Sequence, residues 1–172
     1  MHILNYYFTP FAVILILFAI FFSQPDPQVT RASFVILAAA FAVNWWLGRN
    51  IYRFLRWSRH IRALTVWINL AVSAALFYLL SAYWAPMWLL FLTAPAASAM
   101  YMRKWQVFLI SLASAGLMLG LYYARSLAFG EGGGLGTQLW AMASVQAVFI
   151  IFFSMFTAAM AEMVVKVRDS MR

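Results

Sequence analysis

The sequence predicts an all-α membrane protein: a six-transmembrane-helix bundle with both termini inside the cell and a last helix that extends into the cytoplasm. Three observations lead to this fold class. Of the 172 residues, 66% are hydrophobic and 9% are charged, whereas a soluble domain is about half apolar and about a quarter charged. The apolar residues form six runs with short connections, and the basic residues cluster in alternate connections. A soluble domain is therefore excluded.

The first three apolar runs are predicted to be membrane spans, because about 20 helical residues cross the hydrocarbon core of a bilayer. Span 1 covers about residues 6–22 and ends at the Ser-Gln-Pro-Asp-Pro turn of residues 23–27. No basic segment precedes it and no clear small-residue cleavage site follows, which favours a retained span over a signal peptide. Span 2 covers about residues 32–47, with Gly48 as the residue that ends its helix, and span 3 covers about residues 61–80.

Three further spans complete the predicted bundle. Span 4, about residues 87–102, is short and contains Pro95, a residue type that kinks helices. Span 5 covers about residues 105–123, and a glycine-rich connection at residues 130–136 leads to span 6, about residues 137–161. We expect the 172 residues to form a single six-span membrane domain, because no further domain fits beside six spans in a chain of this length.

The distribution of Lys and Arg predicts the orientation, because short cytoplasmic loops of membrane proteins are enriched in these residues. The connections between spans 2 and 3 and between spans 4 and 5 are basic, as is the C-terminal tail, whereas the alternate connections hold only Arg31 and Arg125. We therefore expect a multi-pass protein of the inner membrane with both termini in the cytoplasm. The residues of the basic clusters are Arg49, Arg53, Arg56, Arg59, Arg62, Arg103, Lys104, Lys166, Arg168 and Arg172.

The net charge of +8 has a different meaning in a membrane protein than in a soluble one. In a soluble chain it would suggest nucleic acid, whereas here it indicates basic loops that face anionic lipid headgroups. Arg49, Arg53, Arg56 and His60 fall on one helical face, which is typical of a short interfacial helix. With Arg59, these arginines are the candidate headgroup contacts, and we expect membrane lipids as partners and no nucleic acid.

The chain offers no constellation of residues for catalysis or metal binding. It contains no cysteine, which excludes disulfides, thiolate metal sites and thiol redox chemistry. His2 and His60 are its only histidines, and no carboxylates accompany them at the spacing of metal ligands. No ionisable residue lies well inside a span, which disfavours a proton-coupled transporter. We expect no catalytic residue, no metal and no cofactor.

Polar and aromatic side chains in and near the spans are candidates for a ligand pocket. An amide inside a span can hydrogen-bond a ligand, or it can bond between helices for about 0.6–2 kcal/mol. Aromatic residues near a boundary can line an apolar pocket, or they can belong to the interfacial belts of membrane proteins. Both interpretations stay open for each residue. The candidate pocket residues are Asn44, Asn69, Tyr83, Trp84, Trp88 and Gln146.

Pairs of small residues four positions apart recur in the spans. Such pairs let helices approach each other closely in lipid. Packing inside the bundle is one interpretation of these pairs, and a contact between two copies of the chain is the other. The pairs are Gly116/Gly120, Ala38/Ala42, Ala71/Ala75 and Ala143/Ala147.

The end of the chain, residues 162–172, is predicted to be a cytoplasmic helical extension of span 6. Its apolar residues follow the three- and four-residue spacing of one helical face and alternate with charged residues such as Glu162 and Lys166. Nothing else in the chain would bury this face, so we expect a partner helix, a second copy in a parallel coiled coil. The alternative is a frayed tail that lies on the headgroups. The predicted signalling and dimer face consists of Met160, Met163, Val167 and Met171.

The central spans resemble those of a known class of proteins. A basic entry to span 3 at Arg62-Ala63-Leu64 and a polar residue early in that span, Asn69, precede a short turn that ends in Pro86. An apolar span 4 then ends at Arg103-Lys104. With six short-looped spans and a charged last helix, the chain resembles the six-transmembrane input domain of bacterial membrane sensor proteins, of the sensor histidine kinase or membrane-bound cyclase type.

Two features depart from the redox-sensing kinases within that class. Their Gly-Gly…Asn-Pro-Phe turn, associated with quinone, corresponds here to residues 81–87, which retain only the proline, and their redox cysteine is absent. The catalytic domain that such a sensor drives is missing as well. We therefore expect the chain to be either a fragment of a longer protein or a free-standing membrane subunit.

The resemblance implies a non-enzymatic sensor or anchor module that passes a membrane or small-ligand signal through its last helix to a cytoplasmic output. A homodimer or a larger membrane complex is the expected assembly. A function of another class is a small membrane subunit of a transport or assembly complex, such as a substrate-binding component of an energy-coupling transporter. A membrane-embedded lipid enzyme is disfavoured, because no acid or histidine is placed for general acid–base catalysis.

Overall fold

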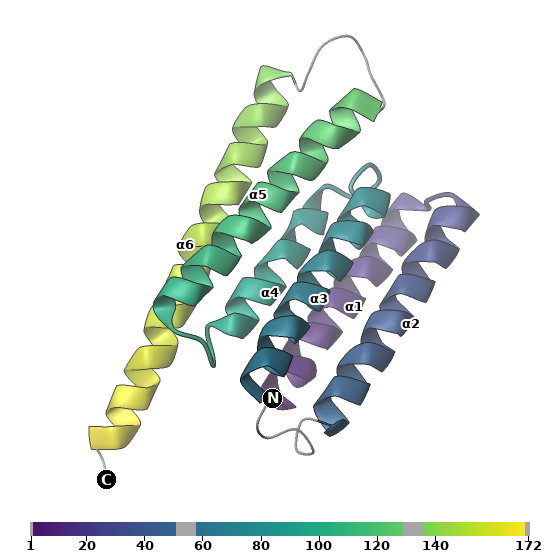
Figure 1. The fold of residues 1–172 in the computed structure, drawn as a ribbon. Coiled ribbons are helices and arrows are strands. Elements are labelled where there is room, and N and C mark those ends of the chain that lie inside the picture. The colour runs from purple at the N-terminus through teal and green to yellow at the C-terminus, as the bar shows by residue number, and fades with distance from the viewer. Residues whose placement is uncertain (1, 51–57, 129–135, 171–172) are drawn as a thin grey trace. The chain divides into compact units, whose positions relative to one another are not determined.

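The structure is a computed structural model that describes residues 2–50, 58–128 and 136–170. All regular secondary structure in these ranges is helical, which confirms the predicted all-α class (Figure 1). The elements are α1 (His2–Ser23), α2 (Pro27–Asn50), α3 (Ser58–Leu80), the 3-10 helix η2 (Ala85–Leu89), α4 (Leu90–Ser98), α5 (Lys104–Ala128) and α6 (Thr137–Ser170).

Four of the helices are long and apolar enough to cross a membrane: α2 over Pro27–Leu47, α3 over Ala63–Leu80, α5 over Lys104–Leu127, and α6. Two shorter apolar stretches, Pro10–Ser23 and Ala85–Ser98, lie in α1 and in η2 with α4. These helices support the membrane assignment. That the two shorter stretches also cross the membrane, which would make six spans, stays a prediction.

The helix ends differ from the sequence predictions at two places. Helix α2 continues past Gly48 to Asn50, so the prediction that Gly48 ends the helix is wrong. Helix α4 ends at Ser98, because the chain then tightens into a turn in which the Tyr101 N–H bonds to the Ser98 carbonyl. The prediction that span 4 reaches residue 102 is therefore too long. By contrast, α6 runs unbroken to Ser170, so residues 162–170 are helical.

The chain divides into two compact units, unit 1 (Met1–Thr93) and unit 2 (Ala94–Arg172). In unit 1, α2 packs against both α1 and α3, and η2 packs against α1 and α3. Its core is made of large apolar side chains, since Ile16, Phe77, Leu80, Met87 and Phe91 are all fully buried. Phe77 and Phe91 meet edge to face, with ring centroids 5.3 Å apart, a favoured aromatic geometry.

Unit 2 is built on the antiparallel pair α5 and α6, which lie side by side (Figure 1). The buried face of α6 consists mainly of small residues at helical spacing, which lets the two backbones approach closely. This is the packing role predicted for Ala143/Ala147. The buried residues of the α6 face are Ala143, Gln146, Ala147, Ile150, Ser154 and Ala158.

The other small pairs do not pack in this way. A Cβ atom added to Gly116 or Gly120 would meet open space, so neither glycine is in close contact with another helix among the described residues. Within unit 2, this glycine pair therefore does not form the contact between α5 and α6. Residues 38, 42 and 71 are also exposed. The close helix approach of unit 2 thus depends on alanines of α6 and not on the glycines of α5.

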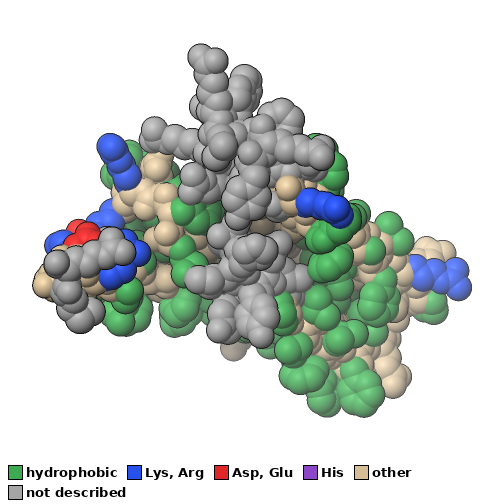
Figure 2. Space-filling model, turned by 90° about the horizontal axis from the view of Figure 1, so that it is seen from below, with side chains coloured by type: hydrophobic (Ala, Val, Ile, Leu, Met, Phe, Trp, Pro, Cys, Tyr) green, Lys and Arg blue, Asp and Glu red, His purple; other side chains and the backbone are tan. Residues whose placement is uncertain are grey.

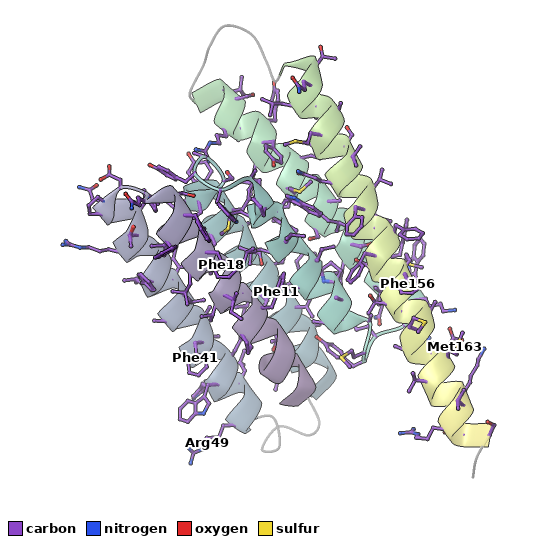
Figure 3. All side chains as sticks on the ribbon, turned by 180° about the vertical axis from the view of Figure 1, so that it is seen from behind. Phe11, Phe18, Phe41, Arg49, Phe156 and Met163 are labelled. Carbon is purple, nitrogen blue, oxygen red and sulfur yellow. The ribbon has the colours of Figure 1, made fainter. Side chains whose placement is uncertain are left out.

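The described surface is strongly apolar. Beside the residues drawn in grey, many of the side chains visible in Figure 2 are hydrophobic, and the acidic side chains visible there lie among basic ones. Phe11, Phe18, Phe41 and Phe156 are exposed, and Figure 3 shows where they leave the ribbon. Exposed apolar patches of this extent mark interaction or membrane surfaces. Lipid chains are the environment in which such a surface is stable.

Candidate functional site

A polar contact joins α2 and α3 inside the apolar part of unit 1. The Asn44 amide nitrogen donates a hydrogen bond to the Asn69 side-chain oxygen at 2.8 Å, and both residues are partly buried. Among the described residues, the side-chain oxygen of Asn44 is buried and has no hydrogen-bond partner. The structure thus brings together two of the predicted pocket residues as an interhelical pair that keeps a free acceptor.

We predict that the Asn44–Asn69 pair stabilises the contact between α2 and α3. Replacing either residue with Ala should lower the free energy of unfolding by about 0.6–1.7 kcal/mol, the range for interhelical hydrogen bonds in membranes. In an Asn44→Ala background, Asn69→Ala should cost clearly less, because the partner is already lost. The measurement is a double-mutant cycle of unfolding in mixed micelles.

Thr65→Ala provides the control for this cycle. The Thr65 hydroxyl donates to the Ile61 carbonyl of its own helix at 2.9 Å. The loss in free energy of unfolding caused by Thr65→Ala should therefore add to the loss caused by Asn44→Ala. Fully additive costs for Asn44→Ala and Asn69→Ala would show that their hydrogen bond contributes nothing to stability.

The turn after α3 holds two more of the predicted pocket residues against the end of α1. The Ser23 hydroxyl donates to the Tyr83 carbonyl at 2.8 Å. The Phe22 and Trp84 rings stack, with centroids 5.7 Å apart and planes 13° apart. The indole N–H of Trp84 is buried with no hydrogen-bond partner among the described residues. Trp88 follows in η2 and is partly buried.

The candidate pocket residues therefore do not form one cluster: those of unit 1 lie at different heights along the helices, and Gln146 lies in unit 2. Asn69 lies 11 residues before the end of α3 at Leu80, which is about 16 Å along a helix, whereas Tyr83 and Trp84 follow that end. Gln146 belongs to unit 2, where its side-chain oxygen accepts a hydrogen bond from the Tyr122 hydroxyl at 3.2 Å. Sequence reasoning missed Tyr122, because its pairing depends on the register of α5 against α6.

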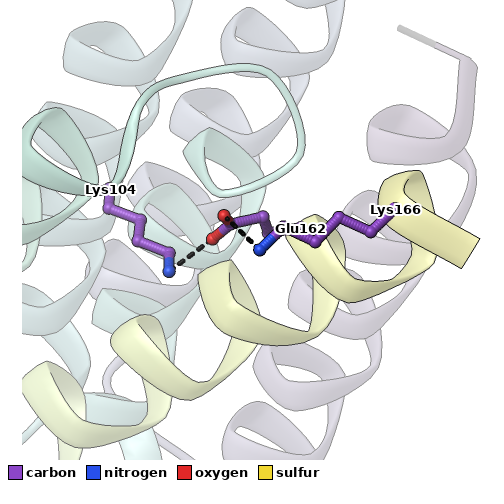
Figure 4. A network of polar contacts seen from close by, with 3 residues as sticks. All are labelled: Lys104, Glu162 and Lys166. Carbon is purple, nitrogen blue, oxygen red and sulfur yellow. Dashed lines mark ion pairs between the residues drawn. The ribbon is translucent and has the colours of Figure 1, made fainter. Parts of the chain in front are cut away.

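An ion-pair network links the helical extension of α6 to the start of α5 (Figure 4). The Glu162 carboxylate pairs with the Lys104 ammonium group and, at 3.4 Å, with Lys166 one turn further along α6. The hydrogen bond from Lys104 and then that from Lys166 lower the pKa of Glu162 below its usual range. The Glu162 side of α6 therefore faces the start of α5.

The opposite side of the extension is apolar and exposed. Met160, Met163 and Val167 are 45%, 59% and 50% exposed, and we call these three residues the apolar stripe. At 100° per residue, Met163 lies about 180° around α6 from Ser154, which faces α5. The stripe therefore lies on the side of α6 away from the helix that α6 packs against; of its residues, Met163 is labelled in Figure 3. Met171, the fourth residue predicted for this face, lies outside the described residues.

The predicted headgroup contacts are described only in part. Arg49 is exposed near the end of α2, and its guanidinium group lies over the Trp45 ring, 5.5 Å from the centroid. A cation above an indole ring is a favourable contact that occurs at membrane interfaces. Arg53 and Arg56 lie outside the described residues. Arg59 lies in the first turn of α3, and its side chain is outside the described part.

Within the described ranges, no group of three or more His, Cys, Asp or Glu side chains is arranged to hold a metal ion. Comparison of the chain with protein-family models, with curated proteins and with solved structures gives no match. The most distinctive features of the described chain are the polar contacts of unit 1 and the long last helix of unit 2.

Proposed function

We propose that this protein is a non-enzymatic membrane sensor or anchor module that passes a membrane or small-ligand signal through α6 to a cytoplasmic output. The observation that supports the proposal is the length and surface of α6. Its 34 residues extend about 51 Å, whereas the hydrocarbon core is about 30 Å thick. One end of α6 therefore leaves the lipid as a helix, and that end carries the apolar stripe.

A continuous helix is suited to carry a displacement out of the membrane. The small residues of α6 seat it closely against α5, and the Lys104–Glu162 pair holds its extension at the start of α5. A shift of this helix pair would move the apolar stripe with it. The stripe, exposed on the far side, is then the surface on which an output helix or a second copy binds.

In the proposed topology, the protein lies in the inner membrane and both of its termini are in the cytoplasm. Lys104, Lys166 and Arg168 lie at the start of α5 and in the extension of α6, and basic residues favour the cytoplasmic side. In this topology α1 and the stretch formed by η2 and α4 are the two additional spans. The resemblance to six-span sensor input domains agrees with this arrangement.

Cysteine cross-linking tests the proposal directly, because the chain contains no cysteine. In native membranes, Met163→Cys should form a disulfide-linked dimer of twice 19.6 kDa on mild oxidation, since parallel copies would bring the two stripes together. Arg168→Cys is the matched control. It is exposed in the same extension but lies about 140° around the helix from Met163, so its cross-linking should be weak.

Three outcomes decide between the functions. Strong cross-linking at residue 163 and weak cross-linking at residue 168 would support a dimeric signalling helix. Equal yields at both positions, or none in membranes at native expression, would contradict it. If neither cysteine cross-links and other membrane chains co-purify in fixed stoichiometry with a bound small molecule, the subunit of a transport complex becomes the better assignment.

A further inference from the structure

The two units are joined through the interior of a helix. Unit 1 ends at Thr93 and unit 2 begins at Ala94, and both residues lie in α4, which spans Leu90–Ser98. A helix that joins two compact units can act as a rigid rod, or it can bend at a defined point. The contacts at the two ends of α4 and the residue at its centre decide which of these it is.

The first turn of α4 is anchored in unit 1. The Ser73 hydroxyl of α3 donates to the Leu90 carbonyl at 3.2 Å. The Phe91 ring packs edge to face on Phe77 of α3, and both rings are fully buried. Leu90 and Phe91 therefore move with α3.

The residues that follow α4 are anchored in unit 2. Ala99 is buried in a cluster with Val107 of α5 and Ala158 of α6, and Met102 packs against the same cluster. The turn then closes on the start of α5, where the Val107 N–H donates to the Arg103 carbonyl. This end of the connection therefore moves with the α5–α6 pair.

Pro95 lies between the two anchors. Proline has no N–H, so the helical bond from residue 95 to the Phe91 carbonyl cannot form, and the ring crowds the preceding turn. The Thr93 hydroxyl donates to the Leu90 carbonyl at 2.6 Å and the Ser98 hydroxyl to the Pro95 carbonyl at 2.7 Å. Hydroxyl bonds of this kind to the preceding turn bend helices further. The weakest point of α4 thus coincides with the boundary between the units.

We infer that α4 is a proline hinge about which unit 2 changes its angle relative to unit 1. Each end of the hinge is fixed in one unit, so bending at Pro95 moves α5 and α6 together relative to α3. The hinge is inferred from the contacts of α4 alone. Its use in signalling, as the step that displaces the apolar stripe, rests on the proposed function.

Spin-label distance measurements on the full chain in bilayers test the hinge. Val35 of α2 and Val148 of α6 are exposed residues in different units, and each can become the only labelled cysteine of its unit. The spread of distances for this pair should exceed the spread for Leu112 and Val148, which both lie in unit 2. Dilution with unlabelled chain removes distances between copies.

Pro95→Ala restores the missing N–H and should narrow the spread of the Val35–Val148 distances while leaving the Leu112–Val148 distances unchanged. Pro10→Ala is the matched control, because Pro10 lies inside α1 and within unit 1, and it should leave both unchanged. A spread between units no wider than that within unit 2, or one that Pro95→Ala leaves unaltered, overturns the hinge. If Pro95→Ala does not fold, the comparison of the two wild-type distance distributions alone decides whether the hinge exists.

A failure of the cysteine cross-linking would contradict the proposed dimeric signalling helix and would not change the measured distances between the units. The two proposals therefore fail separately.

Discussion

Ala147→Phe is expected to disrupt the α5–α6 pair, with a loss of about 1–3 kcal/mol in the free energy of unfolding, the range for overpacking a packed interface. Ala147 lies on the buried face of α6 and is 7% exposed. Ala143, one turn before it on that face, is small and fully buried, which lets the two helices approach closely here. In lipid, helix association depends on close van der Waals packing, and a phenyl ring at this position would force the two backbones apart.

Val148→Phe is the matched control for this substitution. Val148 is the next residue along α6, and it is 67% exposed, so an aromatic ring there extends into lipid. Its effect should stay within about 0.5 kcal/mol, as for surface substitutions in general. Unfolding of both variants in mixed micelles gives the comparison. Similar losses for the two variants would show that α6 does not pack on α5 through its alanine face.

The second large effect is expected in the core of unit 1, where Phe77→Ala should cost about 3 kcal/mol. Phe77 is 1% exposed and packs edge to face on Phe91. Truncation leaves a cavity between α3 and α4 and removes the aromatic contact. The value is set at the lower end of the range for Phe→Ala, because the unfolded chain in a membrane keeps its apolar side chains in lipid and only the packing contribution is lost.

Phe21→Ala separates this packing effect from a general effect of losing a phenyl ring. Phe21 is 74% exposed in α1, so most of its ring lies outside the packed core of unit 1. The variant should unfold within about 0.5 kcal/mol of the wild type. If Phe77→Ala is equally mild, Phe77 does not belong to a packed core and the description of unit 1 is incorrect.

The sequence predicted the helices well, because apolar runs and the absence of charge determine which segments form helices in lipid. It predicted their ends less well. Residues 100–102 continue the apolar run of span 4, so hydropathy could not show that hydrogen bonds of the i→i−3 type close a turn there. The glycine at position 48 suggested a helix end, yet one glycine costs a helix only about 1 kcal/mol, and α2 continues through it.

Contacts between helices were less predictable than the helices themselves. Asn44 and Asn69 were each recognisable as polar residues inside spans, but their pairing depends on the register of α2 against α3, which composition does not contain. Of the small pairs, Ala143/Ala147 faces a neighbouring helix, whereas Gly116/Gly120 faces open space. Spacing alone shows that a pair shares a helical face and leaves open which direction that face points.

The contact between the end of α1 and the turn after α3 has a consequence for the order of folding. The Ser23–Tyr83 hydrogen bond joins residues 60 positions apart, and the Phe22–Trp84 stack closes a similar distance in sequence. The pairs α2–α3 and α5–α6 form between consecutive helices, and closing a long loop costs more entropy than closing a short one. Helix α1 is synthesised first, yet it acquires these contacts only after Tyr83 and Trp84 have left the ribosome.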